Sequence, residues 1–154
     1  MYKIVKPVLD YSVRSLCTKV YPGHPKGCPN YGRRDTCPPH APMIEEILDL
    51  REVFYLIWNS YNLSDHVARM RSRHPGWSSR QLNCCLYWQQ TARGELTNQI
   101  RIFLESQPLR VFEIIRCPEA CGVNVTASMK SVGIDLEWPP VMRAYQVAIA
   151  GRKK

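Results

Sequence analysis

Between residues 17 and 42 the chain carries too much proline and glycine for a regular helix or strand. The residues that break regular structure are Pro22, Gly23, Pro25, Gly27, Pro29, Gly32, Pro38, Pro39 and Pro42. An ordered loop of this length inside a small domain is unusual unless something other than secondary structure organises it. Three cysteines, Cys17, Cys28 and Cys37, lie in this stretch, and a bound metal would supply that organisation.

The chain has 154 residues and seven cysteines. The interpretation of these cysteines depends on the cellular compartment of the protein, because some compartments are oxidising and others reducing. The first residues lack the apolar run of a secretory signal, and no segment is apolar enough to span a bilayer. We therefore expect a cytoplasmic protein with no membrane partner. The cytosol is reducing, which disfavours disulfides and favours metal binding or redox chemistry. Seven is also an odd number, which a fully paired disulfide framework cannot use.

Patterns typical of strands recur along the chain. Apolar, β-branched and aromatic residues dominate five short segments, which are residues 3–9, 52–58, 109–115, 134–138 and 143–149. Proline cannot donate a hydrogen bond to a neighbouring strand, so Pro7 restricts the first segment to a sheet edge. Together these segments predict a single sheet of four to five strands.

Helix patterns lie between the strand segments. They are a short helix after Pro42, one from a cap at Ser64 or Asp65 to about Arg73, one from a cap at Ser78 or Ser79 to about Ser106, and one over 125–132 that stops at Gly133. Strands that alternate with helices indicate an α/β or α+β fold with helices packed on the sheet. We expect one metal-binding domain over residues 1–154, with residues 17–42 as a Cys/Pro-rich loop.

The cysteines fall into two elements that are far apart in the chain. The first element holds Cys17, Cys28 and Cys37, and the second holds Cys117 and Cys121 at the end of a predicted strand. Thiolates are soft ligands, which select zinc, copper(I) or iron–sulfur clusters. Three thiolates from the loop and a fourth from Cys117 or Cys121 would complete the set that a cluster usually takes.

Ligand spacing separates the candidate metals. Structural zinc sites commonly use cysteine pairs about two to four residues apart, and only Cys117 and Cys121 are spaced in that way. We therefore expect an iron–sulfur cluster, of the [4Fe-4S] type, with zinc as the alternative. His24 flanks the loop cysteines, as does His40, but cluster ligation is chiefly thiolate, so both are expected outside the ligand set.

The adjacent pair Cys84 and Cys85 falls within the long predicted helix. Free cysteine usually behaves as a small buried apolar residue, and we expect these two to belong to the core. The sequence shows no Ser/His/Asp set, no phosphate-binding glycine loop and no His-Glu-x-x-His motif. It therefore assigns no catalytic residue and does not decide whether the protein is an enzyme.

Two motifs resemble a known family. Residues 27–32, Gly-Cys-Pro-Asn-Tyr-Gly, followed by Cys37-Pro38-Pro39, resemble the cysteine-rich start of a predicted metal-binding family, domain of unknown function 2284. Residues 128–135, Ser-Met-Lys-Ser-Val-Gly-Ile-Asp, are similar to the Ser-Met-Glu-Ala-x-Gly-Ile-Asp signature of that family. Lys130 stands where the family has an acid. The second cysteine element and this signature together occupy residues 109–135.

The resemblance implies metal binding, as an iron–sulfur cluster, but no particular reaction. The ligands that it implies are Cys17, Cys28, Cys37 and one or both of Cys117 and Cys121. The family often has more cysteines before its signature, and only Cys117 and Cys121 occur here, which argues against a second cluster.

The net charge of +8 suits an anionic partner such as a nucleic acid or a nucleotide. Basic residues are dense only in Arg69–Arg73 and in the tail Arg152–Lys154. Three functions remain open: a cluster enzyme or its accessory, with Glu119 and Asp135 as nearby polar groups; an electron-transfer or redox-sensing protein with a redox partner; and a structural zinc module that binds nucleic acid.

Overall fold

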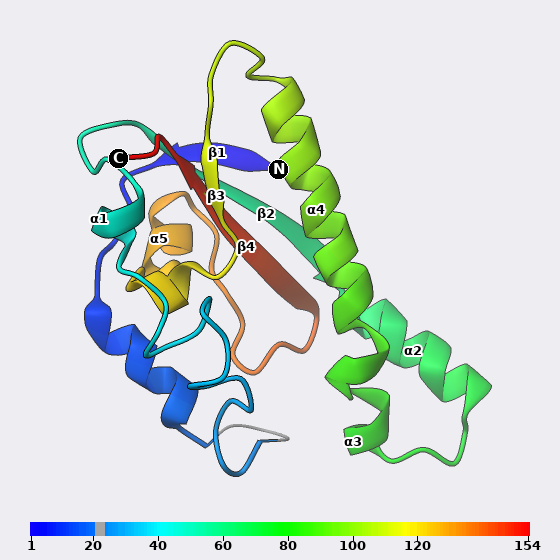
Figure 1. Cartoon of the computed structure of the whole chain (residues 1–154). Helices are drawn as coiled ribbons and strands as arrows, with labels where there is room; N and C mark the ends of the chain where they lie inside the picture. Colours follow the sequence, from blue (N-terminus) through cyan, green and yellow to red (C-terminus); the bar gives the residue numbers. More distant parts are fainter. Residues whose placement is uncertain (21–23) are drawn as a thin grey trace.

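Two nine-residue strands form the centre of the sheet, and one of them, β2 (Phe54–Asn62), is almost wholly buried. The computed structural model describes residues 1–20 and 24–154, so residues 21–23 of the expected loop lie outside the described residues. Within these ranges an antiparallel sheet has the strand order β1-β2-β4-β3 (Figure 1). The other strands are β1 (Tyr2–Val5), β3 (Glu113–Ile115) and β4 (Arg143–Gly151).

Helices connect the strands and pack on both faces of the sheet. The α-helices are α1 (Ile44–Ile47), α2 (Leu63–Arg73), α3 (Ser79–Leu82), α4 (Gln89–Glu105) and α5 (Val125–Ser131). The 3-10 helices are η1 (Tyr11–Thr18), η2 (Cys85–Tyr87) and η3 (Pro118–Cys121). Figure 1 shows α4 along one side of the sheet and α1 and α5 on the other. The prediction of a single sheet with packed helices is confirmed, and the class is α+β.

Successive side chains of β2 point to opposite faces of the sheet, and both faces are buried. Leu56 and Trp58 pack in the cluster that includes residues of α1, η3 and α5. Ile57 packs in the other cluster, against Phe103 of α4. Burial on both faces explains why residues 52–58 form a continuous apolar run in the sequence.

The helix expected from Ser78 or Ser79 to about Ser106 is wrong as one continuous element. Ser78 does cap a helix, but that helix is the short α3, and η2 lies between α3 and α4. A continuous helix would place Leu82 and Trp88 on different faces. The break in the helix lets both of these side chains be buried.

The cap expected at Ser64 or Asp65 is also wrong. The side-chain oxygen of Asn62 accepts a hydrogen bond from the backbone N–H of Asp65, so Asn62 caps α2. Asparagine caps a helix as well as serine or aspartate does. Because Asn62 is also the last residue of β2, the strand passes directly into the helix, which ends at Arg73 as predicted.

Residues 134–138 were expected to form a strand, and they do not. Ile134 and Leu136 pack against the core, which accounts for their alternation with polar residues. Within the described chain no strand runs beside them, so they make no ladder. An alternating pattern indicates that one side of a segment is buried. It does not indicate whether a partner strand is present.

The strand expected over residues 109–115 is shorter than predicted. Gly151, the last residue of β4, lies opposite Glu113, so residues 109–112 have no partner and β3 covers only three residues. β1 lies at the sheet edge, as Pro7 predicts. The sheet of the described residues therefore has four strands, within the predicted range.

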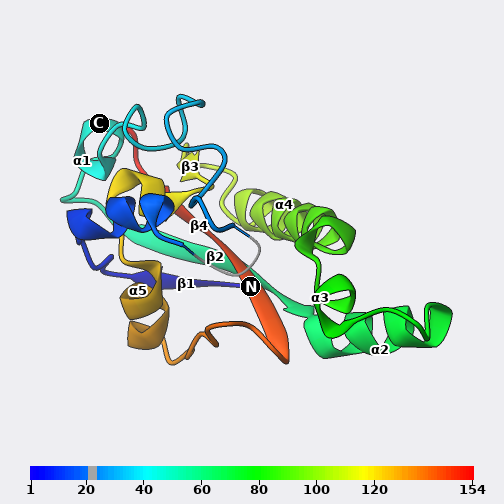
Figure 2. The same cartoon turned by 90° about the horizontal axis from the view of Figure 1, so that it is seen from below.

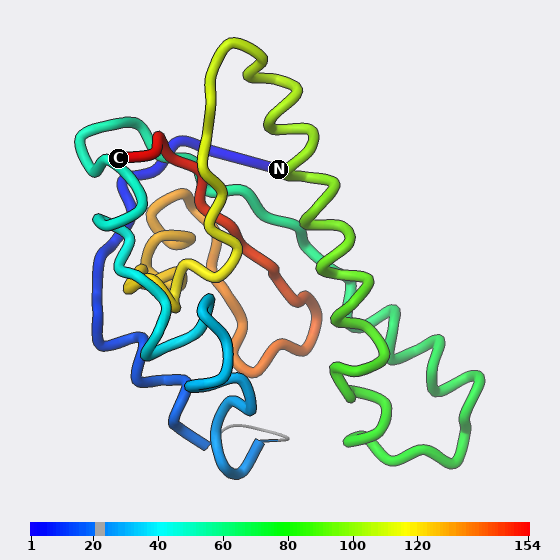
Figure 3. The backbone as a smooth tube through the Cα atoms, in the orientation of Figure 1, coloured from blue at the N-terminus to red at the C-terminus, as the bar shows by residue number. Residues whose placement is uncertain are grey.

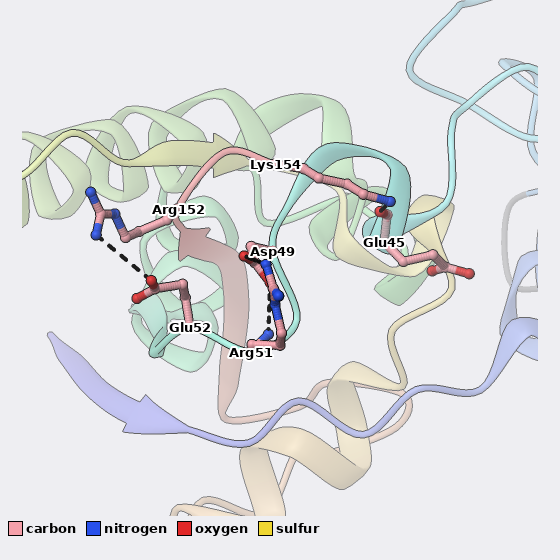
Figure 4. A network of polar contacts seen from close by, with 6 residues as sticks. All are labelled: Glu45, Asp49, Arg51, Glu52, Arg152 and Lys154. Carbon is pink, nitrogen blue, oxygen red and sulfur yellow. Dashed lines mark hydrogen bonds and ion pairs between the residues drawn. The ribbon is translucent and has the colours of Figure 1, made fainter.

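The basic tail is held against the segment that follows α1 (Figure 4). The backbone N–H of Asp49 donates to the carbonyl of Arg152 at 2.9 Å, and Nζ of Lys154 donates to the carbonyl of Glu45 at 3.1 Å. Arg152 also forms an exposed ion pair with Glu52 at 3.7 Å. Exposed pairs of this kind contribute little to stability, whereas the backbone hydrogen bonds fix the path of the chain.

Candidate metal centre

The first cysteine element is organised by backbone hydrogen bonds of its own. Cys17 lies near the end of η1, and Figure 3 shows residues 24–42 without regular helical coiling. The N–H of Cys28 donates to the carbonyl of Cys17 at 2.8 Å, and the N–H of Ala41 donates to the carbonyl of Cys37 at 2.9 Å. The loop therefore holds Cys28 beside η1 through main-chain contacts.

The helix η1 was not predicted, and its signal is local. The side chain of Asp10 accepts hydrogen bonds from the N–H of Ser12 at 3.1 Å and from its hydroxyl at 2.6 Å. Such a cap is typical of a helix start. Ser15 and Thr18 donate their hydroxyls to carbonyls three residues earlier, which supports the tight 3-10 winding.

The second cysteine element packs directly against the first. Cys117 follows β3 and precedes η3, which ends at Cys121. The N–H of Asp10 donates to the carbonyl of Gly122 at 2.8 Å, and the ring of Tyr11 lies against Gly122. Figure 2 shows the helices η1 and η3 next to each other, and the two elements are in contact. The helices η1 and η3 therefore share one corner of the fold, although 100 positions separate Thr18 from Pro118 in the chain.

Four of the five predicted ligands lie within reach of one another's charge. Burial raises the pKa of the Cys17 thiol, and neighbouring acidic groups raise it further. These neighbours are Cys28, Cys37, Glu119 and Cys117. Burial likewise raises the pKa of Cys117, with Glu119 and Cys37 as further causes. Such mutual effects require the thiols to share one region.

Cys121 and Glu119 have different surroundings. Cys121 is buried in the core on the α5 side of the sheet, and burial raises its pKa to about 11. Of the other cysteines, only Cys117 contributes to that shift. Glu119 keeps exposed surface although protein atoms crowd its carboxyl, and this crowding raises its pKa.

The thiols share a region without forming a closed coordination sphere. Within the described residues no three His, Cys, Asp or Glu side chains form a group that could hold a metal ion. The chemistry of the donor set still fits a soft metal, because Cys28, Cys37 and Cys117 all lie near enough to Cys17 to raise the pKa of its thiol. Ligation would require the side chains to move closer together.

A hollow of about 480 Å³ opens beside the first cysteine element. Cys17 and Cys28 line it, together with His24 and the basic residues Lys26 and Arg33. Cationic side chains favour an anionic occupant such as a thiolate-ligated cluster. His40 is exposed and does not line this hollow.

Arg14 is a residue of this region that the sequence did not indicate. Its guanidinium donates to the carbonyls of Pro39 at 3.0 Å and Ala41 at 2.9 Å, and it contacts the sulfur of Met43 at 2.7 Å. It therefore ties η1 to the end of the cysteine loop. Nothing in the local sequence distinguishes Arg14 from a solvated arginine, because its partners are 25 or more positions away.

The expectation that Cys84 and Cys85 are buried core residues is wrong. Both are only half-buried, because they lie in the break between α3 and α4 instead of inside a helix. Cys85 packs at the margin of the cluster around Trp88. Neither residue contributes to the pKa shifts of Cys17, Cys117 or Cys121.

Comparisons with protein families, with curated proteins and with solved structures gave no match to this chain. The resemblance of its two motifs to a metal-binding family therefore stays a prediction. Among the described residues, no helix combines the length and the apolar character that crossing a bilayer requires.

Replacing Gly27 by alanine is expected to destabilise the protein more than replacing Gly32. Their φ angles are +77° and +67°, so both substitutions carry a left-handed penalty of about 1–2 kcal/mol. A Cβ on Gly27 would also lie 2.8 Å from the carbonyl oxygen of Cys17, whereas one on Gly32 meets nothing within 4 Å. Urea unfolding should show a free energy of unfolding at least about 1 kcal/mol lower for Gly27→Ala than for Gly32→Ala. Equal values would contradict the close approach.

Proposed function

We propose that this protein is a cysteine-ligated metal-binding protein that carries a [4Fe-4S] cluster. The ligands are Cys17, Cys28, Cys37 and Cys117. One observation carries the proposal: Cys28, Cys37 and Cys117, from two distant stretches of the chain, lie close enough to Cys17 to raise the pKa of its thiol. In a folded protein, four soft donors in one region are uncommon unless they serve a metal or redox chemistry.

The surroundings of the thiols support a cluster more than a zinc ion. Lys26 and Arg33 line the hollow beside Cys17 and Cys28, where their charge would offset the negative charge of a thiolate-ligated cluster. When bound, the cluster supplies one-electron transfer. The likeness of residues 27–39 to the family described above supports Cys28 and Cys37 as ligands.

The proposal also requires a reducing setting, such as the cytosol. Every one of the seven cysteines is free in the structure. Free thiols persist where the compartment keeps them reduced, and there they remain available to a metal. The chain's own part is to bring the loop and η3 together at the corner where η1 packs against η3.

Metal analysis of anaerobically purified protein tests the proposal. We expect roughly four iron and four sulfide per chain, with a brown colour that is lost in air. The same sample is assayed for zinc. A colourless protein with one zinc per chain would refute the cluster and keep the thiolate site, whereas a protein with no bound metal after anaerobic reconstitution would refute both.

A further inference from the structure

A second hollow lies at the other side of the molecule from the candidate metal centre, between α2 and the start of α4. Its volume is about 390 Å³. The residues that line it include Tyr61, His66, Arg69, Arg73, Tyr87 and Glu95. In both Figure 1 and Figure 2, α2 and η1 lie at opposite sides of the fold. What binds here is therefore independent of the proposed metal centre.

His66 is the buried polar group of this hollow. Only 5% of its surface is exposed, and its Nδ1 lies 3.2 Å from the hydroxyl of Tyr61. Its other ring nitrogen, Nε2, is buried and has no hydrogen-bond partner among the described residues. Buried polar atoms are nearly always paired, and His66 lines the hollow, so a bound ligand would explain this nitrogen. Nε2 has almost no exposed surface, so the ring must shift for a ligand to reach it.

The hydrogen bond to Tyr61 can run in either direction. The hydroxyl donates to Nδ1 when the ring proton is on Nε2, and it accepts from Nδ1–H in the other tautomer. Burial lowers the pKa of His66, and the charge of Arg69 lowers it further, which favours the neutral ring. A phosphate bound at Nε2 would select the tautomer with Nε2–H, because phosphate oxygens accept hydrogen bonds.

Two arginines beside this donor add positive charge. Arg69 and Arg73 are four residues apart on α2, which places them on the same side of the helix. Both are exposed, and neither forms an ion pair within the described chain. Glu95 brings one negative charge, and its carboxylate accepts a hydrogen bond from Asn59 at 2.9 Å. The wall keeps a net positive charge, and a guanidinium pair suits a phosphate group.

Aromatic rings extend the hollow on its open side. Tyr87 lines it and is 51% exposed. The ring of Trp77 lies 5.2 Å from that of Tyr87, and His74 stacks on Trp77 at 4.0 Å. An accessible row of rings beside cations is the arrangement that binds nucleobases and their phosphates.

We propose that this hollow binds a nucleoside phosphate, with the phosphate on His66 Nε2–H, Arg69 and Arg73 and the base against Tyr87. The same unit occurs in a free nucleotide and in single-stranded RNA. Both present a planar base and a phosphate, and the test distinguishes them.

Calorimetric titration of the full chain tests the site with three probes: adenosine monophosphate, inorganic phosphate and a short single-stranded oligoadenylate. The double variant Arg69→Gln/Arg73→Gln should weaken binding of adenosine monophosphate by more than about tenfold, because each charged hydrogen bond contributes more than a neutral one. Tyr87→Leu should weaken it as well. Arg71→Gln on the same helix, which does not line the hollow, is the matched control and should leave binding within about twofold.

The probes decide the source of the ligand. An oligoadenylate that binds much more tightly than the mononucleotide, through the same arginines, assigns the site to RNA; equal affinities assign it to a free nucleotide. The nitrogen NMR signal of His66 Nε2 should shift on binding. The proposal is overturned if neither nucleotide binds, if Arg71→Gln weakens binding as much as the double variant, or if inorganic phosphate matches adenosine monophosphate and Tyr87→Leu has no effect.

Discussion

Replacing Cys37 by alanine is expected to lower the iron content of the anaerobically purified protein by at least about tenfold. Loss of a group that merely supports a ligand already costs about 10- to 100-fold in metal affinity, and Cys37 is a proposed ligand. Its carbonyl accepts from Ala41, and this backbone bond is kept in the variant, so the loop path should survive. Iron and sulfide analysis with the visible absorption spectrum measures the effect.

The matched control for this experiment is Cys85→Ala. Cys85 is a half-buried cysteine at the start of η2, and it is not among the groups that interact with the other thiols. The Cys85→Ala substitution should leave the iron content and the colour of the protein unchanged. A Cys37→Ala protein that keeps the iron content of the Cys85→Ala control would remove Cys37 from the ligand set.

The same assay distinguishes the two candidates for the fourth ligand. Cys117→Ala is expected to lose iron as Cys37→Ala does, because Cys117 and Cys17 lie within reach of each other's charge. Cys121→Ala is expected to keep it, because that side chain packs in the core and only Cys117 among the cysteines affects its pKa. The opposite result would make Cys121 the fourth ligand.

Replacing Phe103 by alanine is expected to lower the free energy of unfolding by about 3–5 kcal/mol. Phe103 is wholly buried on the α4 face of the sheet. Its ring centroid lies 5.1 Å from that of Tyr2, 5.1 Å from that of Tyr55 and 5.0 Å from that of Phe112. The substitution therefore leaves a cavity and removes three aromatic contacts. Small domains are stable by only about 5–15 kcal/mol, so this is a large fraction of the total.

The neighbouring residue Ile102 supplies the control for Phe103. It lies on the same helix and is 41% exposed, so Ile102→Ala changes the helix in a similar way without opening a cavity. We expect a loss within about 0.5 kcal/mol. Urea unfolding followed by circular dichroism gives both values. A Phe103→Ala loss no larger than that of Ile102→Ala would contradict the aromatic cluster.

The parts of the fold that the sequence predicted are those with local causes. Burial of β2 follows from its continuous apolar run, and α5 ends where Gly133 adopts a φ of +87°. Both features depend on residues within a few positions of one another. The predicted edge position of β1 is confirmed, but Pro7 lies beyond this strand, which ends at Val5.

The errors arose where a distant partner decides the outcome. Residues 134–138 alternate like a strand, but a ladder needs a neighbour, and none lies beside them in the described chain. The long helix breaks before Trp88 because the sheet offers a place for that ring beside Tyr61, at 5.7 Å between ring centroids. A pattern along the chain does not contain the position of such a partner.

By itself, the sequence determined the cysteine-rich loop, the thiols available as soft donors and the apolar strands, because residue type and spacing along the chain specify these. Only the tertiary structure decided that η3 packs against η1, which brings Cys117 to Cys17, and that His66 is buried with an unpaired nitrogen beside two arginines. The physical reason is that both arrangements come from contacts between elements distant in the chain. Such contacts form only when the two faces of the sheet are covered.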